Sequence, residues 1–182
     1  GHRDMEIVTW VTKGSLVHQD SIGNSGVIYP GLAQRMSAGK GIMHSEKNDS
    51  WRLNGQSHQE PVRFVQMWVV PDSPGLDPGY EQLEIDDELI RGGLVPVASG
   101  MKKHHGQSAI RISQKSAALH VARLQPGVAV TLPEAPFVHV FVAQGTVQME
   151  GAGELYEGDA VRLTSSGGQR IHSDSPAEIL VW

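Results

Sequence analysis

A nine-residue segment near the start of this chain has a second copy in its last third. Residues 8–16 read Val-Thr-Trp-Val-Thr-Lys-Gly-Ser-Leu, and residues 139–147 read His-Val-Phe-Val-Ala-Gln-Gly-Thr-Val. After a hairpin-like stretch, each copy reaches a further glycine turn, at Gly31 in the first and at Gly158 in the second. Two unrelated hairpins can look alike by chance, but here the order of strands and turns agrees as well. The repeat predicts two homologous β-barrels in tandem, residues 1–95 and residues 96–182.

Short β-prone runs separated by turn residues fill most of the sequence. The 21 glycines and 10 prolines stand mostly between these runs. The segment Tyr80–Ile90 is the one stretch that reads as a helix, and it is short and acidic. Regularly spaced short strands are typical of an all-β sandwich or barrel. The runs are Glu6–Thr12, Gly26–Tyr29, Val62–Val70, Ala118–Leu124, Val138–Ala143, Ala160–Leu163 and Ile179–Trp182.

The composition excludes several classes of function. With 15 Lys+Arg against 20 Asp+Glu the formal net charge is −5, and the few aromatic residues are not interleaved with basic ones, so direct nucleic-acid binding is not expected. No apolar run approaches the ~18 residues of a membrane span, and the first residues do not resemble a signal peptide. The absence of cysteine rules out disulfides, thiolate zinc sites and a cysteine nucleophile. It also fits a reducing compartment, and we expect a cytoplasmic protein.

The nine histidines are the strongest metal-binding groups in the sequence. Residues 2, 4, 6, 8 and 10 alternate along a predicted strand and share one face, which includes His2. His44 and Glu46 are also two residues apart and follow a glycine-rich turn. If the two strands are neighbours in a small barrel, these side chains meet in its lumen, where two histidines and a carboxylate suit a divalent metal with open positions. The alternative is that the histidines are structural and that Glu46 is a surface carboxylate beside Lys47.

The other histidines give weaker signals. His18 precedes the turn at Asp20, and we expect a turn or hairpin position for it. His58 lies in a polar loop. His104 and His105 are adjacent, so in a strand they would face opposite ways. The histidines of the second repeat have no partner at ligand spacing; they are His120, His139 and His172.

Several segments resemble signature motifs of the pirin family. His2–Val11 resembles its H-P-H-R-x-x-E-x-[VL]-T-Y signature, and Gly14–Asn24 resembles its G-x-[LM]-x-H-x-D-S-x-G-N hairpin. Gln34–Glu46 is similar to its Q-x-M-x-A-G-x-G-[IV]-x-H-S-E motif. Shorter matches are Gln66–Pro71 and Pro78–Gln82, and the second half of the chain matches loosely. Together these motifs are specific, and they resemble the bacterial members of the family most.

The resemblance implies a bicupin fold, in which two β-barrels occur in tandem and one metal, usually iron, lies in the N-terminal barrel. The family's ligands are both histidines of H-P-H together with the histidine and the glutamate of H-S-E. They correspond to His2, His44 and Glu46, whereas the first histidine would lie two residues before His2, ahead of the first residue of this chain. The family also has further β-structure before this point, so we expect that the chain is truncated at its N-terminus.

The resemblance further implies quercetin 2,3-dioxygenase activity, in which a metal-bound flavonol reacts with dioxygen and its ring opens with loss of carbon monoxide. Glu46 would be both a metal ligand and the catalytic proton acceptor, and Glu6 would orient an imidazole. The metal would be Fe(II), with Ni, Zn, Mn or Cu as alternatives. The substrates would be a flavonol such as quercetin and dioxygen, and we expect a monomer. The second hypothesis, taken from other members of the family, is a non-enzymatic metal- or redox-sensing protein that acts as a transcription cofactor through protein partners.

Two expectations concern the metal content. When the glycine turns of the repeat are aligned, His44 falls near His172 and Glu46 falls on Ser173, so the C-terminal barrel retains one histidine and is predicted to hold no metal. In the N-terminal barrel one imidazole is missing, and His2 stands at a terminus, where chains fray. We therefore expect weak metal binding by this chain, or none.

Overall fold

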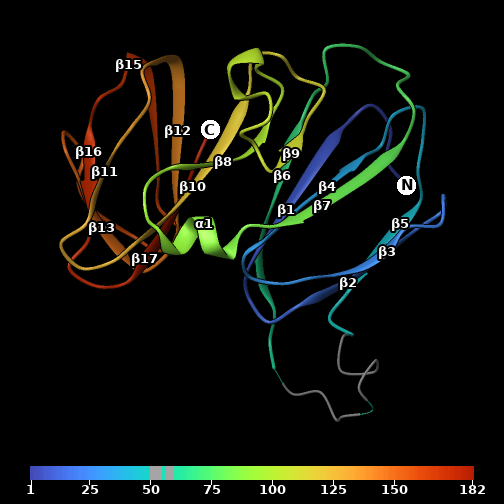
Figure 1. Cartoon of the computed structure of the whole chain (residues 1–182), viewed down its shortest axis with the longest axis horizontal. Coiled ribbons are helices and arrows are strands. Elements are labelled where there is room, and N and C mark those ends of the chain that lie inside the picture. Colours follow the sequence, from blue (N-terminus) through green and yellow to red (C-terminus); the bar gives the residue numbers. More distant parts are fainter. Residues whose placement is uncertain (50–54, 56–59) are drawn as a thin grey trace. The chain divides into compact units, whose positions relative to one another are not determined.

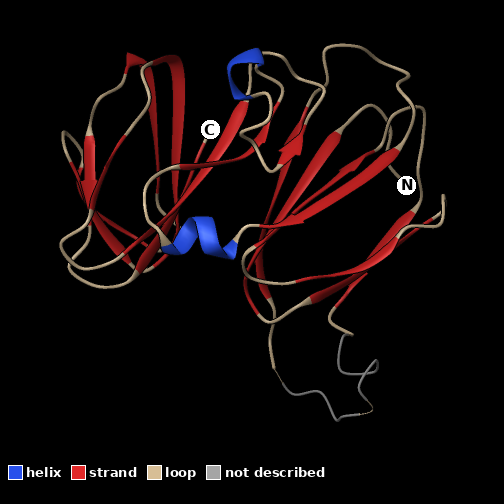
Figure 2. Cartoon of the chain, in the orientation of Figure 1, coloured by secondary structure: helices blue, strands red, loops and turns tan. Residues whose placement is uncertain are grey.

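The structure is a computed structural model, and it describes residues 1–49, 55 and 60–182. The chain divides into two compact units: Gly1–Asp86 with Ala98–Ser116, and Asp87–Val97 with Ala117–Trp182. Strands dominate both units (Figure 2), which confirms the all-β prediction. The expectation for His58 concerns a position outside the described residues.

The first unit contains two sheets (Figure 1). Apolar side chains from β1, β2, β3 and β4 pack together between them. One sheet has the strand order β6-β1-β4-β7, and the other has the order β3-β2-β5. Strand β1 is buried over its first six residues, as expected for a central strand rich in β-branched residues. The strands are β1 (Glu6–Lys13), β2 (Leu16–Asp20), β3 (Ser25–Ile28), β4 (Leu32–Ser37), β5 (His44–Lys47), β6 (Arg63–Val69) and β7 (Gly79–Glu84).

The second unit is also built from two sheets. Their strand orders are β15-β12-β17-β10-β8 and β11-β16-β13-β14. Strand β8 (Val95–Ser99) leads into the first unit, where its last two residues pair in parallel with β9 (Ile110–Arg111). The other strands are β10 (Ala118–Leu124), β11 (Ala129–Thr131), β12 (Ala135–Gln144), β13 (Thr146–Met149), β14 (Gly153–Tyr156), β15 (Ala160–Ser166), β16 (Arg170–His172) and β17 (Ala177–Val181).

The two units repeat one topology, as the internal repeat predicts. The order β6-β1-β4 in the first unit recurs as β17-β12-β15, and β3-β2-β5 recurs as β14-β13-β16. Gly14 joins β1 to β2 with φ +72°, and Gly145 joins β12 to β13 with φ +76°. A Cβ atom at these glycines would lie 2.8 Å from the carbonyl oxygen of Pro61 and 2.7 Å from that of Pro176, respectively. Both turns therefore need a residue without a side chain, which is why the glycine recurs.

The segment Tyr80–Ile90 is only partly helical, so this prediction is wrong for its first half. Its first residues belong to β7, which pairs with β4, and only Asp86–Ile90 forms the helix α1. Pairing along β4 explains the strand, because it satisfies the backbone of this acidic segment and sets Glu81 beside Arg35. A short 3-10 helix, Lys102–His104, follows later. None of the helices in the described part of the chain has the length and apolar character needed to span a membrane.

The N-terminal residues are held by backbone hydrogen bonds, contrary to the expectation that His2 frays. The N–H of His2 donates to the carbonyl of Ile42 at 2.9 Å, and the N–H of Ile42 donates back at 3.0 Å. The N–H of Asp4 donates to the carbonyl of Gly39 at 2.8 Å. Residues 2–4 are thus bound to the turn that precedes β5, which places His2 beside the start of that strand.

We expect Gly39→Ala to lower the free energy of unfolding by at least about 2 kcal/mol, measured by urea denaturation. Gly39 has φ +48°, and a Cβ atom there would clash with the carbonyl oxygen of Leu76, which is backbone and cannot move aside cheaply. Gly23→Ala is the matched control, because Gly23 also has a positive φ, +95°, but has open space around it. It should lose only about 1 kcal/mol. Equal losses in both variants would show that the close approach at Gly39 is unimportant.

Candidate metal centre

The lumen of the first unit contains a layer of polar side chains between two apolar layers. Ile7, Met36 and Ile42 belong to the apolar cluster on one side. Leu16 and Leu32 belong to the apolar cluster on the other side. The strand registers place one polar residue of each strand between these clusters. We call these residues the polar layer: Thr9 of β1, His18 of β2, Gln34 of β4, Glu46 of β5 and Gln66 of β6.

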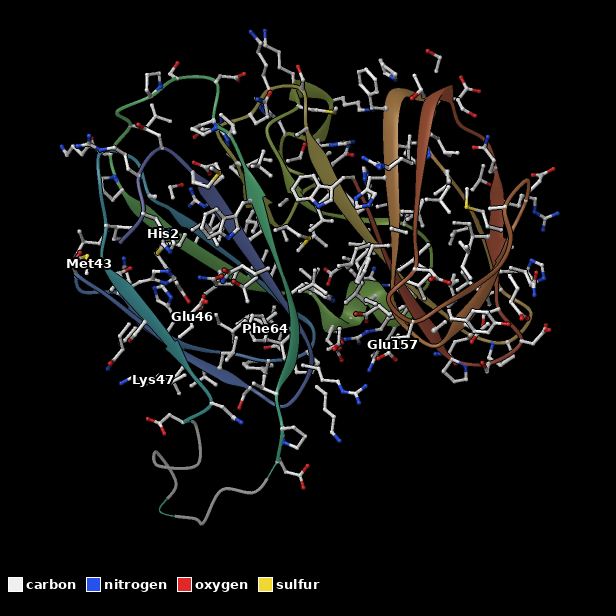
Figure 3. The ribbon with its side chains drawn as sticks, turned by 180° about the vertical axis from the view of Figure 1, so that it is seen from behind. His2, Met43, Glu46, Lys47, Phe64 and Glu157 are labelled. Carbon is white, nitrogen blue, oxygen red and sulfur yellow. The ribbon has the colours of Figure 1, made fainter. Side chains whose placement is uncertain are left out.

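Glu46 is held in this layer by two hydrogen-bond donors. The Thr9 hydroxyl donates to Oε1 at 3.3 Å, and the Gln66 amide donates to Oε2 at 2.6 Å. Burial raises the pKa of Glu46, but His18 and Gln66 at its two oxygens and the charge of His44 outweigh burial and leave this pKa below its ordinary value. Figure 3 shows Glu46 on the inner side of the barrel and Lys47 pointing away from it. Glu46 is therefore an ionised carboxylate inside the barrel, not a surface group.

His18 is completely buried and lies opposite Glu46 on the neighbouring strand. Its Nε2 lies 3.2 Å from Oδ2 of Asp20, and its Nδ1 lies 3.8 Å from Oε1 of Glu46. Burial lowers the pKa of His18, but the two carboxylates outweigh burial and raise this pKa above its ordinary value. His18 was expected in a turn or a hairpin, and it lies in the hairpin formed by β2 and β3, where it is opposite Gly26. The sequence did not predict that its side chain is buried beside Glu46.

His44 completes a group of three potential ligands. Burial lowers the pKa of His44, which favours the neutral imidazole that metals bind. One ligand atom each from His18, His44 and Glu46 lies within 4.8 Å of the other two. In the part of the chain that the structure describes, no other three His, Asp or Glu side chains come together in this way.

His2 lies at the edge of this group rather than within it. Its ring centre is 4.9 Å from that of His44 and 4.8 Å from that of Trp68. The predicted ligands His2, His44 and Glu46 are therefore neighbours in space. His18, which gave a weaker signal in the sequence, is a member of the three-residue group, although its ring centre is 5.6 Å from that of His44.

Glu6 lies on the opposite face of β1 from the polar layer. Side chains alternate along a strand, and Thr9 contacts Glu46, so the even-numbered positions of β1 face the other way. The Glu6 carboxylate instead accepts a hydrogen bond from Ser37 at 3.0 Å and lies 3.8 Å from Arg35. Asp4 has φ +49°, which interrupts the strand and turns His2 out of the predicted alternation. The interpretation that Glu6 orients an imidazole is therefore wrong.

The chemistry of these side chains fits a divalent metal. The Nδ1 atoms of His18 and His44 are both buried and make no hydrogen bond of good geometry, although that of His18 lies 3.8 Å from Oε1 of Glu46. A buried polar atom without a partner is unfavourable, and a metal ion would satisfy both atoms at once. Two imidazoles and a carboxylate also form the ligand set of many Fe(II) and other divalent sites. His18, His44 and Glu46 would hold such an ion, with His2 beside it.

The second barrel has apolar residues at every position of the polar layer. When the turns and strand pairs of the two barrels are aligned, the positions of the polar layer correspond to Val140, Met149, Val161, Ile171 and Val181. Four of these are buried in the core of the second unit, and Val161 packs against it. The counterpart of Glu46 in the second barrel is Ile171, because Glu46 lies opposite His18 and Ile171 lies opposite Met149, the counterpart of His18. The alignment of the glycine turns had matched Glu46 with Ser173, two residues further along the chain.

We therefore expect metal uptake to stop at one ion per chain. The residues at the equivalent positions of the second barrel offer no nitrogen or oxygen ligand atom, and the single thioether of Met149 binds Ni(II) and Fe(II) poorly. The measurement is dialysis against excess Ni(II), removal of loosely bound ions, and elemental analysis of metal and sulfur. Two tightly held ions per chain would contradict this expectation.

Comparisons with known proteins identify relatives of both parts of the chain. Residues 1–69 match the family model described as Pirin, and residues 97–182 match the one described as the quercetinase C-terminal cupin domain. A Mycobacterium tuberculosis protein provisionally named quercetin 2,3-dioxygenase is 58% identical over 182 residues, which make up 100% of this chain and 70% of that protein. Escherichia coli quercetin 2,3-dioxygenase is 30% identical over 182 residues, or 100% of this chain and 73% of that protein.

Solved structures share the same fold. The crystal structure of YhhW from Escherichia coli aligns with a TM-score of 0.82 and 31% identity over 99% of this chain and 71% of that one. A crystal structure of bacterial pirin YhhW in complex with nickel(II) aligns with a TM-score of 0.80 and 31% identity over 99% of this chain and 72% of that one. These matches confirm the two-cupin fold, and the chain belongs to the pirin family.

Proposed function

We propose that this chain carries the catalytic barrel of a metal-dependent dioxygenase that acts on quercetin or a related flavonol. The observation that carries the proposal is the meeting of two imidazoles and a carboxylate in one buried layer. The quercetin 2,3-dioxygenase names of its relatives and the nickel(II) complex of YhhW support it. Fe(II) is the metal we propose, and Ni(II) is the practical probe.

The protein's own residues have three tasks in this reaction. A bound divalent metal supplies Lewis acidity toward the flavonol hydroxyl oxygen. Glu46, ionised in the barrel, accepts the proton of that hydroxyl at a carboxylate oxygen. Thr9 and Gln66 fix the carboxylate in place through their hydrogen bonds to its two oxygens. The apolar clusters on either side of the polar layer keep bulk water away from the reacting atoms. Overall, one flavonol and one dioxygen give a ring-opened ester and one carbon monoxide.

The test is turnover by metal-loaded protein. We expect protein loaded with Fe(II) or Ni(II) to consume quercetin in air, seen as loss of the flavonol absorbance and release of carbon monoxide. Glu46→Gln should abolish this turnover, because the amide cannot accept the proton. Glu6→Gln is the matched control, since Glu6 is also a buried glutamate but lies on the other face of β1. Tight metal binding without flavonol consumption would contradict the proposal and favour the metal-sensing alternative.

A further inference from the structure

A cavity of about 530 Å³ lies in the second barrel. Its apolar wall consists of Met149 of β13 together with Val161 and Leu163 of β15. Its rim comes from residues 150–152, which join β13 to β14, and from residues 167–169, which join β15 to β16. All of these residues belong to the second unit. Cavities of this volume are typical of sites for small organic molecules.

The cavity occupies the place in the second barrel that the candidate metal centre has in the first. Met149, on its wall, is the counterpart of His18. Gln169, on its rim, lies two residues before the counterpart of Glu46 and therefore corresponds to His44. One thioether and one amide do not make a site for a divalent cation. The second barrel thus keeps the position of the metal centre without the metal ligands.

The second barrel is open at this point because β15 lies at the edge of its sheet. In the first unit the counterpart of β15 is β4, and β7 pairs with the outer side of β4. No strand takes this place beside β15 in the described part of the chain. Gln34 and Met36 of β4 are therefore 0% and 1% exposed, whereas Val161 and Leu163 at the same positions of β15 are only partly buried.

Gln169 supplies a polar group that lacks one hydrogen bond. Its Nε2 donates to the Ser166 hydroxyl at 2.5 Å, whereas its Oε1 is buried and accepts no hydrogen bond from the described residues. Exchanging the two atoms leaves the same imbalance, because the amide has one partner for its two polar ends. A single hydrogen bond and a soft terminal torsion allow the amide to turn toward a ligand in the cavity. A ligand hydroxyl would provide the missing donor.

The other lining residues favour an uncharged aromatic ligand. The thioether of Met149 makes favourable contacts with aromatic rings. Gly151 and Gly168 have open space where a Cβ atom would stand, so a flat ring can approach the backbone there. Glu150 is the one charged side chain among the residues that line the cavity, and an acidic group at the rim disfavours anions.

We propose that this cavity is a second binding site, which takes a small uncharged aromatic molecule whose hydroxyl donates to the side-chain oxygen of Gln169. The inference does not depend on the proposed function, because the cavity lies in the other barrel and needs no metal. At the same position of the fold, the first barrel places ligands for a metal and the second barrel places an apolar cavity with one amide.

The test uses 2-naphthol as the probe, with naphthalene and 2-naphthoate for comparison, on metal-free protein that carries carbon-13 in its methionine methyl groups. Met149 lines the cavity and Met36 is buried in the first barrel, so their methyl resonances report on the two barrels separately. We expect 2-naphthol to shift the resonance of Met149 and to leave that of Met36 unchanged. It should bind about tenfold more tightly than naphthalene, because its hydroxyl makes a hydrogen bond, and more tightly than the charged 2-naphthoate.

Two variants assign the binding to this cavity. Gln169→Leu should remove the tenfold advantage of 2-naphthol over naphthalene and leave naphthalene affinity unchanged. Gln148→Leu is the matched control, because Gln148 is also in this barrel but does not line the cavity and donates to Glu154 at 2.9 Å. Leu163→Trp fills the cavity and should abolish binding of both probes, while its thermal unfolding transition shows that the variant is folded.

Four results would overturn the inference. They are no shift of Met149 at saturating 2-naphthol, a shift of Met36 in its place, equal affinity for 2-naphthol and naphthalene, and unchanged 2-naphthol affinity in Gln169→Leu. The first two would show that the cavity is not the binding site. The last two would show that the oxygen of Gln169 is satisfied by a bound water and not by a ligand.

Discussion

Replacing His44 by alanine is expected to weaken Ni(II) and Fe(II) binding by more than about 100-fold and to abolish flavonol turnover. His44 provides a buried Nδ1 atom without a hydrogen bond to the candidate centre. Its loss leaves one close imidazole and one carboxylate, which hold a divalent ion poorly. Loss of a group that only orients a ligand already costs about 10- to 100-fold in metal affinity, so loss of a ligand should exceed this range. Anaerobic calorimetric titration measures the change.

His105→Ala is the matched control for this experiment. His105 is exposed, follows the 3-10 helix Lys102–His104 and lies outside the three-residue group. It should leave both metal affinity and turnover unchanged. Unchanged affinity in His44→Ala would show that the ligands lie elsewhere. The same titration of the unmodified chain tests the sequence-based expectation of weak binding, which counts His2, His44 and Glu46 as ligands but not His18.

Much of the fold could be predicted from local sequence, because turns and β-branched runs are local signals. Gly14 and Gly145 mark the repeat, since each turn combines a positive φ with a close backbone contact. The face of β1 that enters the lumen could not be predicted in the same way. Six consecutive residues of this strand are buried, so the alternation of polar and apolar residues that normally reveals the inner face is absent.

His18 was missed because its functional partners are distant in sequence. It stands in a five-residue strand, Leu16–Asp20, next to polar residues and a turn, which is typical of an exposed hairpin. Its burial depends on pairing with β5, where His18 lies opposite Glu46. One local signal does exist: Asp20 is two residues away, which puts a carboxylate on the same face of the strand as the imidazole.

Asp20→Asn is expected to lower metal affinity about 10- to 100-fold, although Asp20 is not one of the candidate ligands. Burial raises the pKa of Asp20, but hydrogen bonds from Asn24, His18 and Ile22 outweigh burial and lower this pKa, so the group is a carboxylate. A carboxylate only accepts hydrogen bonds, so the neutral ring of His18, the form that binds a metal, donates its Nε2–H to Asp20 and keeps Nδ1 free of a proton on the side of Glu46.

An asparagine at position 20 keeps one oxygen for the backbone N–H groups of Ile22 and Asn24 but turns an NH2 group toward the ring of His18. His18 then shifts its proton to Nδ1, where it competes with the metal. Asn24→Ala is the control, because it removes the Asn24 side-chain donor to Asp20 without touching His18. It should lower the free energy of unfolding by about 1 kcal/mol and leave metal affinity unchanged.

Nitrogen-15 NMR of the neutral imidazole of His18 reads the tautomer directly: we expect a protonated Nε2 in the unmodified protein and a protonated Nδ1 in Asp20→Asn. The same tautomer in both proteins, or equal metal affinity, would show that Asp20 only stabilises the turn.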